Sequence, residues 1–493
     1  MKPSQSMILK DVVRDVPHLK WYGSDTINVG SVVYDTRKLK EGDLFCTWSG
    51  EQTDGHEYLS DAVRKGACAL VVENEPNRLP DCPVVVVESG RSALSLLAAN
   101  RWGNPANDLK LTGITGTNGK SSTATLLHYL LESSEFPCGL IGTIEYRLGD
   151  RVEPAERTTP EGSDTQEMLA TMREAGCRGA VMEVSSHALD QGRVSGIAYQ
   201  GAIFTNLSPD HLDYHKNMDA YFSAKCVLFE QITPGGFAVL PKNSQYTPAI
   251  EQRIDKTIEI LHYGVTPEAL SQAIDIQYFR SGTSFVWKIR DEEHEVMAPW
   301  IGSYNLENIL AAMTAAVGYG IEPAHIASLM EKAPPVPGRL ERVDVDERFT
   351  VLVDYAHTED ALRNVLRALQ PLKERRLKTL IGCGGNRDRT KRPKMAQVAC
   401  EFSDEVIFTS DNPRDEEPEL ILQEMVDGVT DHKNHSVIVD RKEAIRAILE
   451  SAAKGDIILV AGKGHERTQE VRGTKHPFSD VEVVIEVLKG QQR

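Results

Sequence analysis

The chain has 493 residues and lacks three features that mark special classes of protein. It has no run of 18 apolar residues, which a membrane-spanning helix would need, and its first residues contain no apolar signal core. Its eight cysteines are scattered without a Cys-x-x-Cys pair, so we expect reduced, packed thiols rather than disulfides or a zinc cluster. These absences favour a cytoplasmic protein without a membrane partner.

Basic residues are also fewer than acidic residues. The chain has 55 Lys and Arg against 72 Asp and Glu, which gives a formal net charge of −17. This balance argues against a nucleic acid or an anionic membrane surface as the partner. Anionic small molecules would therefore have to be bound by local clusters of Lys and Arg and by helix ends. The length predicts about three domains.

A glycine-rich turn at residues 116–119 follows the apolar run 111–115 and precedes an apolar helical pattern. Small residues let backbone N–H groups close around phosphate oxygens at the start of the helix. Lys120 can reach the β- and γ-phosphates, and the Ser121 hydroxyl can bind Mg²⁺. The first glycine of the usual motif lies one residue early, at Gly113. The sequence thus predicts a nucleotide site made of Gly116, Thr117, Asn118, Gly119, Lys120, Ser121 and Ser122.

Strand-like runs alternate with helical patterns along most of the chain, which predicts parallel α/β sheets. One series lies at residues 111–115, 180–184, 202–205 and 237–240, and a second at 349–353, 379–383, 405–409 and 457–461. The proline-rich stretch 334–338 separates the two series and is typical of a linker. We expect domains at residues 1–108, 109–335 and 336–493.

Three candidate metal or catalytic residues follow strands of the first series: Glu183, His211 and Lys225. In an open α/β sheet, ligands bind beyond the carboxyl ends of the strands. A Glu, a His and the hydroxyl of the phosphate loop could hold Mg²⁺ against ATP. The pair His211 and His215 lacks a third ligand at zinc spacing. Taken alone, Glu183 could also be a salt-bridged carboxylate, His211 a helix cap and Lys225 a surface lysine.

Several motifs occur in the order that is found in one family. They are Gly-Thr-Asn-Gly-Lys-Ser at 116–121, Glu-Val-Ser-Ser-His at 183–187, Asn-x-x-x-Asp-His-x-Asp at 206–213 and Ala-Lys-x-x-Leu-Phe at 224–229. With them the chain resembles the Mur ligases, the ATP-dependent amino-acid-adding enzymes of peptidoglycan precursor synthesis. The resemblance implies three domains: an N-terminal UDP-sugar-binding domain, a central P-loop ATPase with a parallel sheet, and a Rossmann-like C-terminal domain that binds the amino acid.

The same resemblance assigns roles in the central domain. It implies that Lys225 is carbamylated and that Lys120, Lys225 and His211 are catalytic. A carbamate would turn a lysine, which repels Mg²⁺, into an anionic oxygen ligand. The implied magnesium ligands are Ser121, Glu183, His211 and Lys225 as its carbamate.

Three segments further along the chain resemble the family's remaining ATP contacts. They lie at residues 302–308, 337–341 and 354–358, and the implied ATP-binding residues in them are Asn305, Arg339, Asp354 and His357. The family usually has proline where this chain has Glu359.

The segment Asp-Asn-Pro-Arg at 411–414 resembles the signature of the Mur ligases that add meso-diaminopimelate at the third peptide position. Diaminopimelate differs from lysine by a second carboxylate, which an arginine can bind with two parallel hydrogen bonds. The implied contacts with this amino acid are Arg387, Asp411, Asn412, Pro413, Arg414, Gly462 and Glu466.

The N-terminal segments 33–37 and 41–45 resemble the family's UDP-sugar region, with Thr36 in place of a serine. The implied contacts with UDP-MurNAc-L-Ala-D-Glu are Tyr34, Thr36, Glu51, Gln52, Thr53, Thr158, Thr159, Ser185, Gln191 and Arg193.

The implied reaction is ATP-dependent ligation through an acyl phosphate, with ATP and Mg²⁺, small-molecule substrates and a monomeric enzyme. No residue stands out as the general base for the incoming amine. The alternatives are a related ligase that adds lysine or another amino acid, a folylpolyglutamate-type enzyme, or a non-catalytic ATP-dependent switch. Arg414 and the UDP-sugar segments argue against the first two. A non-catalytic switch would not need the complete set of candidate catalytic and metal-binding residues, which are Lys120, Glu183, His211 and Lys225.

Overall fold

The computed structural model describes residues 6–50, 53–343, 348–429 and 434–491. The chain divides into two compact units, which are described separately. One comprises residues 1–263 with 311–321, and the other comprises residues 264–310 with 322–493. Among the described residues, no helix is both long and apolar enough to cross a membrane.

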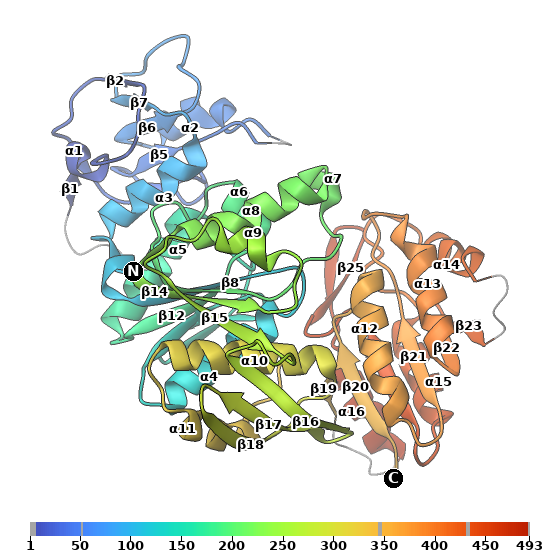
Figure 1. Ribbon diagram of the computed structural model, residues 1–493. Coiled ribbons are helices and arrows are strands. Elements are labelled where there is room, and N and C mark those ends of the chain that lie inside the picture. Colours follow the sequence, from blue (N-terminus) through green and yellow to red (C-terminus); the bar gives the residue numbers. More distant parts are fainter. Residues whose placement is uncertain (1–5, 51–52, 344–347, 430–433, 492–493) are drawn as a thin grey trace. The chain divides into compact units, whose positions relative to one another are not determined.

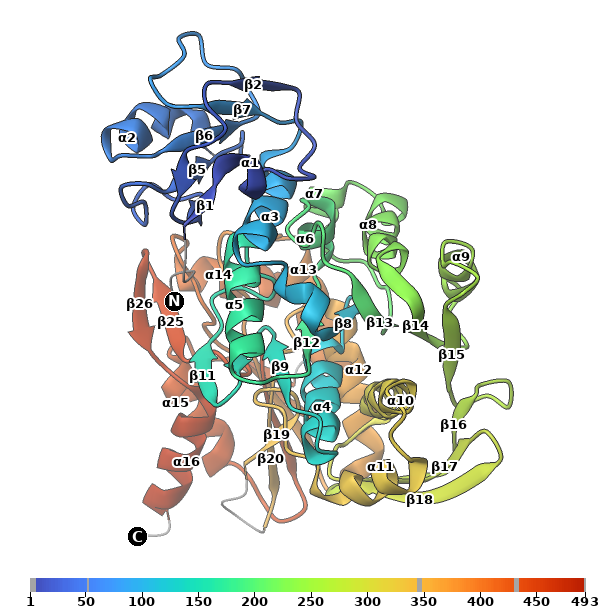
Figure 2. The same cartoon turned by 90° about the vertical axis from the view of Figure 1, so that its left-hand side faces the viewer.

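The first sheet of unit one has the strand order β2-β7-β6-β5-β4. Its strands are β2 (Lys20–Tyr22), β4 (Val32–Val33), β5 (Leu44–Cys46), β6 (Ala69–Val72) and β7 (Val84–Val86). Strands β4 to β7 are parallel, and β2 pairs with β7 in the antiparallel sense. Figure 2 shows α2 (Leu59–Arg64) on one side of this sheet, and α1 (Leu9–Val12) and α3 (Gly90–Arg101) on the other. A separate pair is formed by β1 (Met7–Ile8) and β3 (Asn28–Val29).

The central sheet of unit one has the order β11-β10-β9-β12-β8-β13-β14-β15. Strands β8 (Lys110–Thr115), β9 (Cys138–Ile141), β12 (Gly179–Glu183), β13 (Tyr199–Phe204), β14 (Ile232–Pro241) and β15 (Glu259–Gly264) are parallel. A hairpin of β10 (Glu145–Leu148) and β11 (Arg151–Pro154) adds the antiparallel edge. The parallel strands are consecutive in this order, from β9 to β15, as expected for strands that are covered on both faces.

Helices cover both faces of the central sheet (Figure 1). On one face, α5 (Gly162–Glu174), α6 (Ser186–Asp190), α8 (Met218–Glu230) and α9 (Thr247–Glu251) share one buried apolar cluster with the strands. Helix α4 (Lys120–Ser133) lies on the opposite face, and the short α7 (Leu212–His215) follows β13.

Unit two begins with three antiparallel strands, β16 (Ser271–Phe279), β17 (Gly282–Ile289) and β18 (Glu292–Ala298). Helices α10 (Ser303–Gly318, which continues into unit one) and α11 (Pro323–Leu329) follow. The main sheet has the order β19-β20-β24-β21-β22-β23. Its strands are β19 (Glu341–Arg342), β20 (Thr350–Asp354), β21 (Leu377–Ile381), β22 (Glu405–Phe408), β23 (His435–Val437) and β24 (Ile457–Ala461), all parallel except β19.

This second sheet is also covered on both faces. Helices α12 (Glu359–Leu369), α13 (Lys391–Phe402) and α14 (Pro418–Asp427) share one buried apolar cluster with it. Helices α15 (Arg441–Glu450) and α16 (Asp480–Gln491) share a second buried apolar cluster with the same sheet. A hairpin of β25 (Thr468–Val471) and β26 (Thr474–Pro477) precedes α16. The predicted α/β class, with a parallel sheet in each of the two strand series, is confirmed.

One ion pair is completely buried in unit two. Arg441, at the start of α15, donates from Nε and Nη2 to the two carboxylate oxygens of Asp480, at the start of α16, each at 2.7 Å. Both side chains have 0% exposure, and Arg441 also donates to the carbonyl of Ala461 at the end of β24 (2.9 Å). The pair therefore joins two helices to the sheet with its hydrogen bonds satisfied.

We expect Asp480→Ala to lower the free energy of unfolding of this part of the chain by about 3–5 kcal/mol, because it leaves a buried guanidinium without its counter-charge. Hydrogen exchange of the β24 amides during urea titration measures the loss. The matched control is Glu443→Ala, which removes the exposed partner of Arg446 on the same helix and should cost about 1 kcal/mol or less. Equal effects of the two substitutions would contradict this account.

Candidate active site

The predicted phosphate loop connects β8 to α4 and needs glycine at two positions. Gly116 has φ 152°, and a Cβ there would lie 1.9 Å from Oγ1 of Thr205. Gly119 has φ 85° and forms the N-cap of α4. Glycine reaches these backbone angles without steric cost, so the loop can turn tightly into the helix. The N–H groups at the start of α4 are thereby placed at the end of β8.

Asn206, at the end of β13, holds the loop in shape. Its carbonyl accepts a hydrogen bond from the N–H of Thr117, and its Oδ1 accepts one from the N–H of Asn118, each at 2.9 Å. Thr205 Oγ1 also donates to the carbonyl of Asn118 (2.6 Å). The sequence indicated Asn206 only as part of a motif, without a role. The structure shows that it links the loop to a neighbouring strand.

Two lysines converge on one backbone carbonyl. Lys120 Nζ donates to the carbonyls of Gly116 and Thr117, and Lys225 Nζ donates to the carbonyl of Gly116, all at 2.9 Å. Lys225 lies on α8, is 2% exposed, and has its Nζ 4.4 Å from the ring centroid of Tyr221. Burial lowers the pKa of Lys225 well below its ordinary value; the charge of Lys120 lowers it further, and Asp210 opposes the shift. Both effects favour the neutral form of the Lys225 amine.

Glu183 ends β12 and faces the first turn of α4. Its Oε2 accepts hydrogen bonds from the hydroxyls of Ser121 and Thr143, each at 2.9 Å, and its Oε1 accepts the N–H of Thr143 at 2.8 Å. The side chain is 2% exposed. The structure therefore brings together Glu183 and Ser121, as predicted from their positions, and adds Thr143, for which the sequence gave no signal.

His211 lies at the N-cap of α7 with φ 53°, and half of its side-chain surface is exposed. Desolvation lowers its pKa, Lys120 and Lys225 lower it further, and Asp210 opposes them. Its ring lies 4.8 Å from that of His187 and 6.3 Å from that of Tyr221. His215, by contrast, is buried and hydrogen-bonded to Ser186 Oγ (2.9 Å). Of the two histidines, His211 is the one that is accessible to a ligand.

Glu183 and Ser121 offer the carboxylate and hydroxyl oxygens that Mg²⁺ prefers, and His211 offers an imidazole nitrogen. In the described ranges, no three His, Cys, Asp or Glu side chains are arranged to hold a metal ion. The predicted set has only two side chains of those types, Glu183 and His211. A metal ion here would therefore need a further ligand, such as the hydroxyl of Ser121.

The predicted UDP-MurNAc-dipeptide contacts in the central domain lie close to Glu183. Thr159 Oγ1 donates to the carbonyl of Glu183 (2.9 Å), and Thr158 Oγ1 is 3.0 Å from Thr143 Oγ1. Arg193 donates to the carbonyl of Thr159 (3.1 Å) and, from Nε and Nη2, to Oε1 of Gln191 (3.1 and 2.7 Å). The Ser185 hydroxyl caps α6 and lies 3.4 Å from Thr159 Oγ1.

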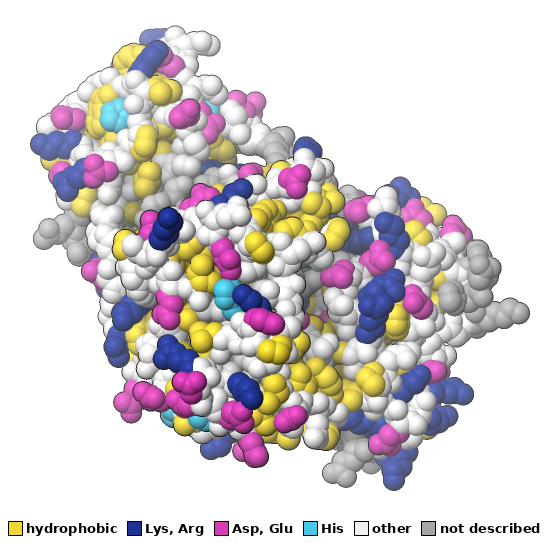
Figure 3. Space-filling model, in the orientation of Figure 1, with side chains coloured by type: hydrophobic (Ala, Val, Ile, Leu, Met, Phe, Trp, Pro, Cys, Tyr) yellow, Lys and Arg dark blue, Asp and Glu magenta, His cyan; other side chains and the backbone are white. Residues whose placement is uncertain are grey.

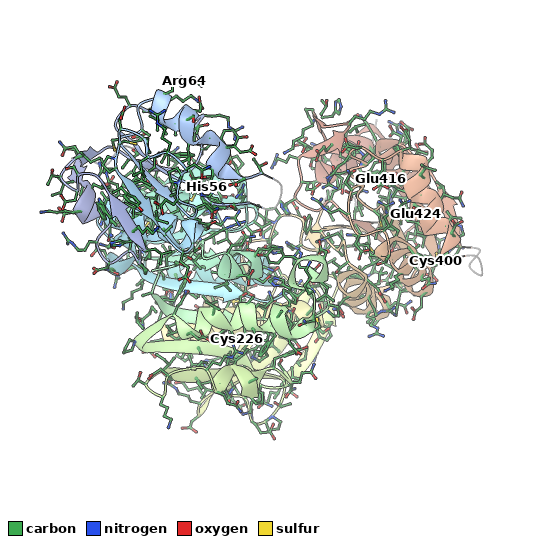
Figure 4. The ribbon with its side chains drawn as sticks, turned by 90° about the horizontal axis from the view of Figure 1, so that it is seen from above. His56, Arg64, Cys226, Cys400, Glu416 and Glu424 are labelled. Atoms are coloured by element: carbon green, nitrogen blue, oxygen red, sulfur yellow. The ribbon has the colours of Figure 1, made fainter. Side chains whose placement is uncertain are left out.

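The predicted N-terminal contacts are less closely grouped. The Tyr34 hydroxyl donates to Asp164 Oδ2 of α5 (2.8 Å), and Thr36 is buried, with its carbonyl bonded to Lys65 Nζ (2.9 Å). Thr53 is exposed, and Glu51 and Gln52 lie outside the described residues. Beyond them, His56 (labelled in Figure 4) accepts the N–H groups of Glu73 and Asn74 at Nε2 (3.2 and 3.1 Å).

Unit two holds the other predicted ATP contacts. Arg339 lies 4.8 Å from the ring centroid of Tyr355, and Asp354 is buried and accepts the N–H groups of Leu340 (2.6 Å) and Ala356 (2.7 Å). Burial raises the pKa of Asp354, and Arg339 opposes that shift. His357 is exposed, and its Nδ1 lies 2.9 Å from the carbonyl of Tyr355. Asn305, in contrast, is 3% exposed, and its amide donates to the carbonyl of Ile301 (2.9 Å) within its own helix start.

The predicted amino-acid contacts gather beyond β21, β22 and β24. Asn412 Nδ2 donates to Glu466 Oε2 (2.8 Å), and buried Lys463 donates to Asn412 Oδ1 (3.0 Å) and to Glu466 Oε2 (2.7 Å). Arg414 has φ 52°, donates from Nη1 to the carbonyl of Gly385 (2.8 Å), and has Nε 3.4 Å from Glu470 Oε2. Arg387 is exposed on the neighbouring loop. Lys463 is an addition that only the structure reveals.

A buried arginine anchors the Arg414 loop. Arg392 of α13 is 0% exposed; it donates to both oxygens of Glu416 (2.8 and 2.9 Å) and to Glu424 Oε2 (2.8 Å). Figure 4 shows Glu416 and Glu424 close together in this part of the fold. The hydrogen bond with Arg392 lowers the pKa of Glu416 to about 2. Glu416 also accepts the N–H of Asn386 (2.6 Å), so both loops of the predicted amino-acid site share one anchor.

Comparisons with known proteins agree over nearly the whole chain. Residues 28–102 match the Mur ligase family catalytic domain, residues 114–316 the Mur ligase middle domain, and residues 338–464 the Mur ligase glutamate ligase domain. A protein of Solibacter usitatus is 44% identical over 94% of both chains, and one of Cytophaga hutchinsonii is 39% identical over 98% of this chain and 99% of its own. Both are named UDP-N-acetylmuramoyl-L-alanyl-D-glutamate--2,6-diaminopimelate ligase.

Solved structures agree as well. The structure of a UDP-N-acetylmuramoyl-L-alanyl-D-glutamate--2,6-diaminopimelate ligase is similar with a TM-score of 0.71, 30% identity, and coverage of 99% of this chain and 100% of that one. MurF ligase from Thermotoga maritima, in complex with ADP, shares the fold with a TM-score of 0.64 at 19% identity, over 94% of this chain and 97% of that one. The chain therefore belongs to the Mur ligase family.

Proposed function

We propose that this protein is the Mur ligase that joins meso-2,6-diaminopimelate to UDP-MurNAc-L-Ala-D-Glu, with ATP as the energy source. The observation that carries this choice of substrate is the position of Arg414. Its guanidinium lies against the carbonyl of Gly385, in a loop that Arg392 and Glu416 fix in place. An arginine fork suits the second carboxylate of diaminopimelate, which lysine lacks. The names of the relatives support the same substrates.

The proposed reaction activates a carboxylate. The D-glutamyl carboxylate of the UDP-linked substrate attacks the γ-phosphorus of ATP, which forms an acyl phosphate and releases ADP. The neutral amine of diaminopimelate then attacks the acyl carbon, phosphate leaves, and the amine gives up a proton. Lys120 and the N–H groups at the start of α4 would stabilise the negative charge on the transferring phosphoryl group.

Lys225 is proposed to work as a carbamate. A neutral amine can attack CO₂, and loss of the amine proton then leaves a carbamate anion. Burial and Lys120 lower the pKa of Lys225, which favours the neutral amine that this reaction needs. The carbamate would also place a negative charge beside Lys120 in place of an ammonium group. With Ser121, Glu183 and His211 it would hold Mg²⁺, which offsets the charge of the ATP phosphates when it is bound.

The direct test is phosphate release from ATP with UDP-MurNAc-L-Ala-D-Glu and one of three additions: meso-diaminopimelate, L-lysine or no amino acid. We expect rapid release only with diaminopimelate. Preference for lysine would identify the related lysine-adding activity, and release that does not depend on the nucleotide sugar would rule out a ligase of this class.

Lys120→Ala should lower kcat by about 100-fold to 1,000-fold, because it removes the main positive charge from the developing phosphoryl transition state. Steady-state phosphate release measures the loss, and circular dichroism checks the fold. Lys256→Ala, which removes an exposed lysine of the same unit, is the control and should keep full activity. Near-normal turnover of folded Lys120→Ala would refute the nucleotide site.

Lys225→Ala should be nearly inactive, because no carbamate can form. Acetate or formate should restore part of the activity by supplying a carboxylate in the space left by the side chain. Native protein depleted of CO₂ should gain activity when bicarbonate is added, whereas Lys225→Ala should not respond. A fully active Lys225→Ala protein would mean that this lysine only packs against Tyr221 and bonds to the carbonyl of Gly116.

Arg414→Ala should reduce kcat/KM for diaminopimelate by at least about 30-fold, because truncating one partner of a buried charge pair costs about 2–5 kcal/mol. Its use of lysine should fall much less. Arg414→Lys keeps the charge without the fork and should be intermediate. Arg472→Ala is the control. Arg472 is an exposed arginine, and its backbone N–H donates to the carbonyl of Arg414. Equal losses for both amino acids would show that Arg414 only supports the loop.

A further inference from the structure

A completely buried lysine lies behind the predicted amino-acid contacts of unit two. Lys and Arg side chains are spread over the face drawn in Figure 3, where water can solvate their charges. Lys463, in the loop after β24, has 0% exposure and no such access to water. A buried charge is costly unless it is paired and hydrogen-bonded. The partners of Lys463 therefore indicate what this residue does.

The ammonium group of Lys463 uses all of its donors within the protein. Its Nζ donates to Oδ1 of Asn412 (3.0 Å), to Oε2 of Glu466 (2.7 Å) and to the carbonyl of Thr468 at the start of β25 (2.8 Å). A lysine ammonium has three N–H groups, so none is left for a substrate. Lys463 can therefore act on a ligand only through these neighbours.

The hydrogen bond from Lys463 fixes the amide of Asn412. The Oδ1 atom of Asn412 also accepts the N–H of Glu470 (2.9 Å), so its Nδ2 faces the other way and donates to Oε2 of Glu466 (2.8 Å). Oε2 of Glu466 thus accepts two hydrogen bonds, from Lys463 and from Asn412. The other carboxylate oxygen of Glu466 has no donor among the described residues, and this side chain is 30% exposed. That oxygen remains for an ammonium group of a ligand.

Glycines on both sides bring the backbone of Lys463 close to its partners. Gly462 has φ 109° and Gly464 has φ 51°. A Cβ on Gly462 would lie 2.8 Å from Oδ2 of Asp411, and a Cβ on Gly464 would lie 2.7 Å from Cβ of Tyr355. Side chains at these positions would force the loop away from both neighbours. The loop is thus shaped to place Lys463 beneath the segment 411–414.

Lys463 also balances the charge of Glu466, with which it forms an ion pair at 2.7 Å. The segment 411–414 carries Arg414, which is proposed above to bind the second carboxylate of diaminopimelate. Without Lys463, Glu466 would be an unbalanced anion at this site. It would repel a ligand carboxylate and attract a ligand that ends in an ammonium group, such as lysine. The buried lysine therefore bears on the choice of amino acid.

We propose that Lys463 is a positioning residue for the amino-acid substrate. It orients the amide of Asn412 and the carboxylate of Glu466, and its charge keeps the site suited to a ligand with both a carboxylate and an ammonium group at its far end. This inference rests on the proposed function. The competing explanation is that Lys463 only stabilises the fold.

The same sheet offers a matched control. Lys378 of β21 is 1% exposed, and its Nζ donates to the carbonyl (2.8 Å) and the hydroxyl (2.7 Å) of Ser451. It also pairs with Oε2 of Glu405 at 2.8 Å, and Glu405 is 32% exposed, much like Glu466. Lys378 lies near the N-terminal end of its strand, whereas the predicted amino-acid contacts lie beyond the carboxyl ends. It therefore reports the cost of losing a buried lysine away from the site.

The test measures phosphate release by the full chain at saturating ATP and UDP-MurNAc-L-Ala-D-Glu, with varied diaminopimelate or lysine. Lys463→Met keeps the apolar stem and removes the charge. We expect KM for diaminopimelate to rise about 10-fold to 100-fold, as for loss of hydrogen bonds to a charged group, with a much smaller change in kcat. The ratio of kcat/KM for diaminopimelate to that for lysine should fall at least about 10-fold. Lys378→Met should lose similar stability, but should keep the native KM and the native ratio.

A second comparison does not depend on the folding of the single variant. Lys463→Met combined with Glu466→Gln removes both charges of the pair, so no charge is left without its partner. We expect its KM for diaminopimelate to be about 10-fold higher than that of Glu466→Gln alone, because the Asn412 amide is no longer held.

Two results would overturn the proposal. One is a native amino-acid ratio in folded Lys463→Met, and the other is an equal KM for the double variant and Glu466→Gln. Either would show that Lys463 only stabilises the fold. If native protein releases no phosphate in response to diaminopimelate, the proposed function fails instead.

Discussion

The candidate active site depends on one carbonyl oxygen, that of Gly116, which accepts hydrogen bonds from both Lys120 and Lys225 at 2.9 Å. Two ammonium groups that share one acceptor in a buried site would repel each other strongly. Burial of Lys225 and the charge of Lys120 both lower the pKa of Lys225, which weakens this repulsion. The same loop is held by Thr205 and Asn206, which bond to the backbone of Thr117 and Asn118. The proposed roles of Lys120 toward phosphate and of Lys225 as a carbamate both start from this shared carbonyl.

Much of the fold could be predicted because glycines and strand-like runs mark it locally. The phosphate loop is an example, since Gly116 and Gly119 adopt backbone angles that favour glycine. The parallel strands could be identified for the same reason: their apolar runs are short and bounded by polar turns. The chain's family membership supports the roles of whole motifs, but it does not describe the contacts inside them.

The contacts that complete the site could not be predicted, because they join residues far apart in the sequence. Thr143 binds Glu183 with its N–H and its hydroxyl, yet no motif marks it. Lys463 is buried and donates to both Asn412 and Glu466, although it lies 51 residues from Asn412 in the sequence. The sequence likewise did not indicate that the amide of Asn305 donates to the carbonyl of Ile301, and the contact of Asn305 with ATP stays a prediction. Long-range packing decides such details.

The central claim is that Lys225 acts as an anion and not as a cation. Incubation of native protein with ¹³C-labelled bicarbonate, followed by ¹³C NMR, tests it directly. We expect a carbamate resonance that is absent from Lys225→Ala and retained in Lys256→Ala. If native protein under turnover conditions shows no such resonance, Lys225 is unmodified and this account of the site is wrong.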